Sequence, residues 1–106
     1  MWIMSKIGFF SIVEKPKGKI CIRSRKRQDL STLKLLFSTN AEIVRTPNAD
    51  YRFRMILNRS FFEEQFVKLA RLVDYSNFKD AVGKVNRKRE ALYHKVWYDL
   101  LPIEHE

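Results

Sequence analysis

Four arginines in two short runs are the side chains of this sequence best suited to bind a ligand. Arg23 and Arg25 alternate with other residues in one run, and Arg52 and Arg54 do so in another. Residues two apart in a strand point to the same face and lie roughly 6.5–7 Å apart. Guanidinium groups can donate paired hydrogen bonds to phosphate oxygens. If the two runs form neighbouring strands, we expect a basic patch that contacts nucleic acid, RNA or single-stranded DNA rather than duplex.

Nearby cations would extend this patch, and an aromatic side chain on the same face would let bases stack. Either Phe9 or Phe10 must point to that face if their strand is regular. The competing interpretation is a solvated sheet face, whose arginines cover apolar surface with their stems and pair with Glu14 or Glu42. The predicted nucleic-acid-binding residues are Arg23, Arg25, Lys26, Arg27, Arg45, Arg52 and Arg54.

The overall charge supports a polyanionic or acidic partner. The chain has 21 Lys and Arg against 12 Asp and Glu, which gives a formal net charge of +9. A surface of this sign attracts nucleic acid and speeds encounter with acidic proteins. It argues against an acidic mimic of DNA. An acidic protein partner therefore stays open beside nucleic acid.

A second candidate site lies near the C-terminus, where Arg89 precedes His94, with Arg87 nearby. This spacing resembles the signature of HEPN ribonucleases, an arginine four to six residues before a histidine. The resemblance implies acid–base and phosphate-stabilising roles for the pair. HEPN domains are all-helical, whereas the first half of this chain has the pattern of a sheet. We therefore favour a partly buried structural histidine and a non-enzymatic protein, with ribonuclease as the third alternative.

A third candidate is a group of polar and aromatic residues that could form a partner-binding pocket between two helices. The alternative is a polar network between those helices, in which the Tyr and Trp rings are buried and their polar ends stay solvated. The group comprises Asp74, Tyr75, Asn77, Phe78, Tyr93, His94 and Trp97.

Nothing in the sequence indicates a metal or a cofactor. His94 and His105 are far apart, and the three glycines are isolated, so no phosphate-binding loop is present. The adjacent Glu63 and Glu64 belong in the first turn of a helix, where they complement its dipole. Cys21, the single cysteine, excludes an internal disulfide.

The elements that would position these residues are predicted from hydrophobic periodicity. Strands are expected at 7–13 and 20–25, joined by the Pro/Gly turn at 15–19, and again at 42–45 and 51–57. In the last of these, Tyr51, Phe53, Met55 and Leu57 share one face. Asp29 is expected to cap a helix between the two pairs of strands.

Helices are expected through the second half of the chain. Ser60 and Glu63 form the pattern of a capping box before a helix that places Phe62, Phe66, Leu69 and Val73 on one side. Ser76 or Asn77 would cap a further helix.

The last helix has Leu92, Val96 and Leu100 on one stripe, which could pack against the upstream elements, and ends at Pro102. The whole predicts a single α+β domain, residues 1–106, with a four-stranded antiparallel sheet (ββαββ), helices on one face and a C-terminal helical segment.

Several stretches together resemble a family of small uncharacterised bacterial proteins. The shared pieces are GFFSIV at 8–13, DYSNFKDAV at 74–82 and ALYHKVW at 91–97. Such relatives carry Gln-Gly between the two C-terminal motifs, where this chain has Val85-Asn86-Arg87, so the helix junction is expected to differ. The resemblance implies a compact bacterial cytoplasmic domain and carries over no activity. The lack of a long apolar run and of a signal-peptide pattern also favours the cytoplasm and no membrane contact.

Overall fold

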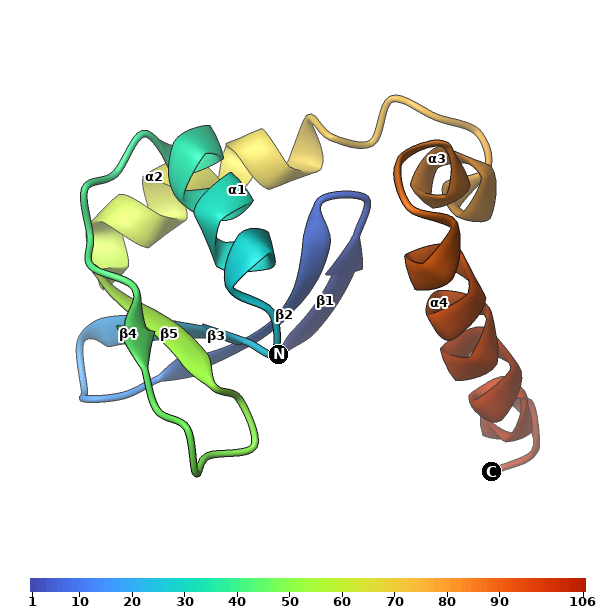
Figure 1. Ribbon diagram of the computed structural model, residues 1–106, viewed down its shortest axis with the longest axis horizontal. Coiled ribbons are helices and arrows are strands. Elements are labelled where there is room, and N and C mark those ends of the chain that lie inside the picture. Colours follow the sequence, from blue (N-terminus) through green and yellow to red (C-terminus); the bar gives the residue numbers. More distant parts are fainter. The chain divides into compact units, whose positions relative to one another are not determined.

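The computed structural model describes all residues, 1–106, and shows an α+β fold with a five-stranded antiparallel sheet (Figure 1). The elements are β1 (Trp2–Ser5), β2 (Gly8–Glu14), β3 (Lys19–Ser24), α1 (Arg27–Phe37), β4 (Val44–Arg45), β5 (Phe53–Asn58), α2 (Arg59–Ala70), α3 (Phe78–Val85), α4 (Arg87–Asp99) and a 3₁₀ helix (Leu101–His105). The strand order is β1-β2-β3-β5-β4. The predicted fold class is confirmed, with five strands instead of four, because the short β1 was not predicted.

Contacts within the chain form two compact units, residues 1–73 and 74–106. The first unit holds the whole sheet with α1 and α2, and the second holds α3, α4 and the 3₁₀ helix. Each is described by itself below. Whether 1–106 folds as one domain stays a prediction, because a grouping of contacts does not measure cooperativity.

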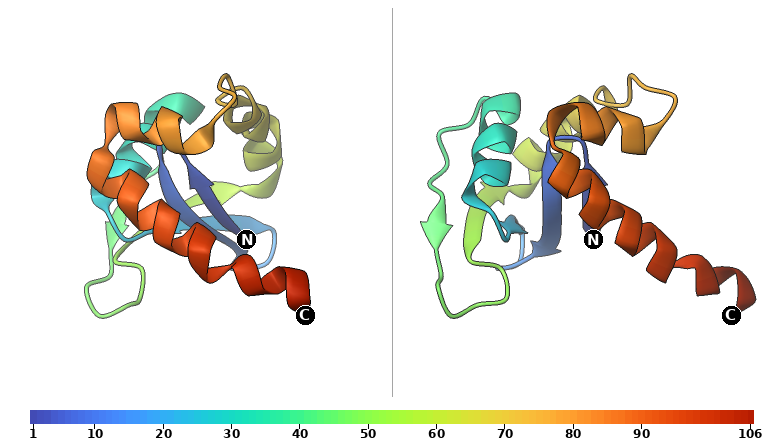
Figure 2. Two further views of the ribbon diagram at one scale, coloured as in Figure 1. Left: turned by 90° about the vertical axis from the view of Figure 1, so that its right-hand side faces the viewer. Right: turned by 45° about the vertical axis from the view of Figure 1, so that its right-hand side comes forward.

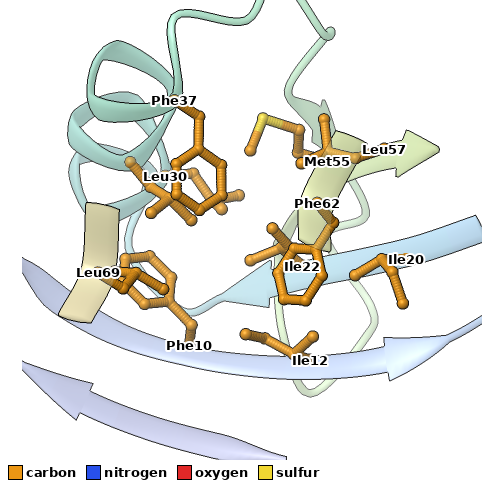
Figure 3. Packing of buried hydrophobic residues seen from close by; sticks show 11 residues of the cluster. Phe10, Ile12, Ile20, Ile22, Leu30, Phe37, Met55, Leu57, Phe62 and Leu69 are labelled. Atoms are coloured by element: carbon orange, nitrogen blue, oxygen red, sulfur yellow. The ribbon is translucent and has the colours of Figure 1, made fainter. Parts of the chain in front are cut away.

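The core of the first unit lies between one face of the sheet and the two helices (Figure 3). Alternate residues of β2, β3 and β5 face it, and residues three or four apart on α1 and α2 meet them, as the two periodicities require. Burying these apolar side chains supplies most of the favourable free energy of folding. The buried cluster consists of Phe10, Ile12, Ile20, Ile22, Leu30, Leu33, Phe37, Met55, Leu57, Phe62 and Leu69.

The start of α1 differs from the prediction that Asp29 caps it. Lys26 is the N-cap residue and forms no side-chain cap, while Asp29 lies inside the first turn and is buried. Its carboxylate accepts a hydrogen bond of 3.0 Å from the backbone N–H of Phe9. Gly8 has φ +155°, and a Cβ there would lie 2.7 Å from the Asp29 Cβ. Asp29 therefore fastens α1 to the beginning of β2, and Gly8 makes room for it.

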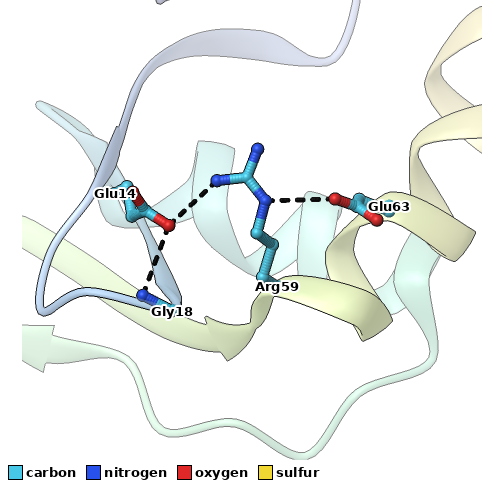
Figure 4. Close-up of polar contacts among 4 residues, drawn as sticks. All are labelled: Glu14, Gly18, Arg59 and Glu63. Carbon is cyan, nitrogen blue, oxygen red and sulfur yellow. Dashed lines mark hydrogen bonds and ion pairs between the residues drawn. The ribbon is translucent and has the colours of Figure 1, made fainter.

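The start of α2 also differs, because the predicted capping box at Ser60 is absent. Asn58 is the N-cap residue, without a side-chain cap, and Ser60 lies within the helix. Arg59 instead donates hydrogen bonds to Glu63 (3.1 Å) and to Glu14 (3.0 Å), which raise the pKa of its guanidinium (Figure 4). Glu14 also accepts from the Gly18 N–H at 3.2 Å. These contacts tie the β2–β3 turn to α2.

The predicted apolar side of α2 is correct for Phe62, Phe66 and Leu69 and wrong for Val73. Phe62 and Leu69 belong to the buried cluster, and Phe66 packs against it. Val73 lies beyond the end of the helix and is exposed. The stripe stops where the helix stops.

Two asparagines define the helices of the second unit. The Asn77 side chain accepts a hydrogen bond from the Asp80 N–H at 3.0 Å, which confirms Asn77 as the cap of α3. Asn86 ends α3 and caps α4, since its side chain accepts from the Arg89 N–H at 2.9 Å. The junction is thus a break in the helix at one residue, and α3 meets α4 at a marked angle (Figure 2).

The apolar stripe predicted for the last helix is present on α4 but is largely exposed. Leu92 is 56% exposed, Val96 39% and Leu100 50%. Tyr93, on the neighbouring side of the helix, is buried. In Figure 2, α4 continues into the 3₁₀ helix, where Pro102 occupies the first turn.

Candidate nucleic-acid interface

The face of the sheet that points away from the core carries the candidate site, and we term it the outer sheet face. The pairing registers and the alternation of each strand place on it Trp2, Met4, Phe9, Ser11, Val13, Cys21, Arg23, Arg54 and Ile56. The face therefore combines cations with aromatic and aliphatic side chains.

Arg23 and Arg54 lie directly opposite each other on β3 and β5. The prediction that these two strands are neighbours with their arginines on one face is confirmed for this pair. The Arg23 Nη2 donates to the Ser11 Oγ at 2.7 Å, and the Arg54 Nη2 donates to the Tyr51 backbone oxygen at 3.4 Å. Both side chains are half-buried, and their Nε atoms are buried without a hydrogen-bond partner. Both guanidiniums therefore pack against the sheet, and each keeps an Nε–H donor that has no hydrogen-bond partner in the structure.

Tyr51 is buried against the arginine cluster, which consists of Arg23, Arg25 and Arg54, and lies outside the apolar cluster between the sheet and the helices. The alternation of 51–57 had predicted that it shares the core-facing side with Phe53. The guanidinium carbons of Arg23 and Arg25 each lie 4.9 Å from the centre of its ring. The prediction fails because β5 begins at Phe53, so the alternation does not extend to Tyr51. Cations over an aromatic face are attracted by its quadrupole. The ring of the buried Tyr51 therefore packs against two guanidiniums, and both come from residues at or directly after the C-terminal end of β3.

No carboxylate neutralises the predicted basic residues. None of the seven takes part in an ion pair, and Glu14, one of the two acids expected to pair with them, binds Arg59. Like charges directly opposite on adjacent strands destabilise a sheet. Arg23 and Arg54 therefore face each other without a carboxylate to offset their like charges.

The charge of the chain is concentrated in the unit that carries this face. Residues 1–73 contain 15 Lys and Arg against 6 Asp and Glu, while residues 74–106 contain 6 of each. The first unit therefore carries the whole formal charge of +9, and the second is neutral. The net positive charge therefore belongs to the first unit alone.

The other predicted cations are not all on the outer sheet face. Arg45 pairs with Phe53, so alternation turns it away from the side of Arg54. Lys26 and Arg27 are exposed at the start of α1, beyond the end of β3. Arg52 is exposed before β5 and makes none of the contacts of the arginine cluster. The structure brings together Arg23, Arg25 and Arg54, and the remaining four stay separate.

Aromatic side chains adjoin the arginines on this face. Phe9 points outward, whereas Phe10 is fully buried in the core. Trp2 is 74% exposed, with its ring edge-on to Phe9 at a centroid distance of 6.2 Å. Trp2 was missed because β1 was not predicted, although the alternation of Trp2 and Met4 before a turn was a signal for it. Trp2 is separated from Arg23 by Ser11 of the intervening strand, so the exposed indole shares the outer sheet face with the arginines.

The polar–aromatic group of the second unit forms a ring stack. Phe78 lies 5.8 Å from Tyr75 and 5.7 Å from Tyr93, measured between ring centroids, and the Arg89 guanidinium carbon lies 5.8 Å from the Tyr93 ring. Asn77 is occupied as a helix cap. Because these rings pack on one another, they act as the small core of this unit.

The rest of that group is on the surface. His94 and Trp97 are exposed and stack at 5.3 Å, and the Lys79 Nζ lies 5.0 Å from the Trp97 ring. Asp74 is exposed in the segment before α3. These three predicted residues are therefore open to a partner, whereas Tyr93 is not.

Arg89 and His94 lie on different sides of α4. Arg89 lies over Tyr93, whereas His94 is exposed with Trp97, so the expectation of a partly buried His94 is wrong. A rotation of about 140° separates any two residues five apart on a helix, so this placement follows from the spacing itself. The ribonuclease alternative stays a prediction.

No group of three or more His, Cys, Asp and Glu side chains is placed to hold a metal ion. No helix has both the length and the apolar character needed to span a membrane.

Comparison with known proteins gives no match to any family model, curated protein or solved structure.

Proposed function

We propose that this protein is a small non-enzymatic binding domain that contacts single-stranded nucleic acid, RNA or DNA, through its outer sheet face. Arg23, Arg54 and Arg25 bind phosphates, while Trp2 and Phe9 receive bases. The observation that carries the proposal is the cross-strand pair Arg23–Arg54, which has no carboxylate partner.

Single strands suit this face better than a duplex does. Exposed Trp2 and Ile56 flank the arginines and offer apolar surface to unstacked bases. A duplex hides the faces of its bases, so it would use only the cations. The outlying Lys26, Arg27, Arg45 and Arg52 then supply weaker contacts along the path of the strand.

The test is the salt dependence of binding to a labelled single-stranded oligonucleotide, followed by fluorescence anisotropy. For single strands, the logarithm of affinity falls with the logarithm of salt concentration by about 0.7 per phosphate contact. The double variant Arg23→Gln/Arg54→Gln should therefore bind more weakly and flatten this slope by about 1.4. Duplex of the same sequence should bind less tightly than the single strand.

A matched control removes the same charge elsewhere in the first unit. Lys17 lies in the β2–β3 turn and Arg71 at the end of α2, and both are exposed. Lys17→Gln/Arg71→Gln should leave the slope nearly unchanged. An equal change in both double variants, or none in either, would remove the outer sheet face as the site. Circular dichroism checks that each variant is folded, and Arg23→Lys/Arg54→Lys, which keeps the charge but not the paired donors, should weaken binding with the slope retained.

An acidic protein is the second candidate ligand, which would make the chain a regulator or inhibitor of a larger complex. The exposed Ile56 and Val44 beside the arginines favour it, because protein interfaces combine arginine with apolar side chains. Recovery of one stoichiometric protein, unchanged by nuclease treatment and lost in Arg23→Gln/Arg54→Gln, would favour this candidate over nucleic acid.

A further inference from the structure

The exposed side of α4 is apolar over more than two turns. We name the α4 stripe for its three members, Leu92, Val96 and Leu100, which succeed one another every four residues and are exposed by 56, 39 and 50%. Trp97 and Leu101 widen it, with exposures of 51 and 40%. Such a contiguous apolar surface on a helix is typical of an interaction site.

The charges along α4 run against its dipole. The first turn carries Arg87, Lys88 and Arg89 against a single acid, Glu90, and the C-terminal end carries Asp99 and, in the 3₁₀ helix, Glu104 beside His105. Cations at the N-terminus and anions at the C-terminus of a helix are each unfavourable in isolation. A second helix with the same charges, packed antiparallel to α4, would offset this unfavourable interaction. Its acidic C-terminal end would then lie beside the basic N-terminal end of α4.

We propose that the α4 stripe binds the α4 stripe of a second copy of this chain, with the two helices antiparallel. A two-fold axis at Val96 places Leu92 of each copy opposite Leu100 of the other. The same axis places Lys88 of each copy opposite Glu104 of the other at both ends of the contact. A two-fold interface of this kind is self-complementary in both shape and charge.

The first test is the mass of the full-length chain in solution, by sedimentation equilibrium after nuclease treatment, so that nucleic acid cannot bridge copies. The expected result is a concentration-dependent species of twice the 12.7 kDa chain mass. The double variant Leu92→Asp/Val96→Asp should be monomeric. Leu35→Asp, at an exposed leucine on α1 of the first unit, is the control and should still dimerise. A monomer at every concentration, or a dimer that persists in the double variant, overturns the proposal.

Cross-linking with a bismaleimide tests the direction of the helices. The native Cys21 is buried, so single variants Leu92→Cys and Leu100→Cys supply the reactive thiols. Antiparallel helices bring residue 92 beside residue 100 of the other copy, so a mixture of the two variants should cross-link more efficiently than either alone. Equally efficient cross-linking of each variant with itself would indicate parallel helices and overturn the arrangement.

Discussion

The two units of the chain differ in which side chains they bury and which they expose. In the first unit, apolar side chains from one sheet face and two helices bury one another, while the other sheet face carries unpaired cations. In the second unit, only Val82 and Tyr93 are buried, and α4 leaves its apolar stripe exposed with no net charge on the unit. The first unit therefore exposes positive charge, and the second exposes apolar surface.

The difference follows from the number of layers that each unit has. A sheet covered by two helices encloses a set of side chains from several directions, so a core forms. Two short helices meet along one line, which in this chain is occupied by Phe78 and Tyr93. Of the α4 side chains, only Tyr93 is buried, because a unit of two short helices buries a small fraction of its surface.

The largest difference between the two units is expected in the free energy of unfolding when one leucine of each unit is replaced by alanine. Leu33 is fully buried, whereas Leu92 is 56% exposed. Leu33→Ala should lower the free energy of unfolding by about 2–5 kcal/mol because it leaves a cavity. Leu92→Ala should change it by no more than about 0.5 kcal/mol in dilute solution. Urea unfolding followed by circular dichroism measures both, and comparable losses would show that the α4 stripe contributes to a core.

The two tryptophans distinguish the units in binding. Trp2 is exposed on the outer sheet face, and Trp97 is exposed on α4. Trp2→Ala should weaken binding of a single-stranded oligonucleotide by about 1–3 kcal/mol, because one base loses its stacking partner. Its salt slope should stay as in the wild type, since no charge changes. Trp97→Ala is the control, and a loss of affinity in that variant instead would move the interface to the second unit.

The smallest difference in the free energy of unfolding is expected between two residues near helix starts, Asn86 and Ser60. Asn86→Ala removes a hydrogen bond to the first turn of α4 and should destabilise the protein by about 1 kcal/mol. Ser60→Ala should have an effect below about 0.5 kcal/mol, because Ser60 is not a cap in the structure. Thermal unfolding monitored by helical circular dichroism compares them. A larger loss at Ser60 would indicate that the capping box forms in solution.

The part of the fold that the sequence predicted well is the part with regular alternation. Ile20, Ile22 and Arg23 fall on the expected faces of β3, and Arg54 and Met55 do so on β5. The pattern was reliable here because a shift of one residue would have buried arginine and exposed isoleucine. It could not predict that β3 and β5 are neighbours, which the pairing of the two strands in the structure shows.

The predictions that failed depended on where elements begin or on what covers them. Alternation did not reveal that β5 starts after Tyr51, so that residue was placed in the core. Asp29 has the residue type of a cap, but only the position of β2 shows that its carboxylate binds the Phe9 N–H. The periodicity of α4 showed that one side is apolar and could not show that this side is exposed.

Asn86 ends α3 and also caps α4, so no linker separates the two helices. The direction of α4 relative to α3 is then set by two backbone dihedrals of a single residue, φ −156° and ψ 99°. A longer linker would sample many directions and lose that freedom when a partner binds. In the proposed dimer, this two-helix element would therefore lose little conformational entropy on binding.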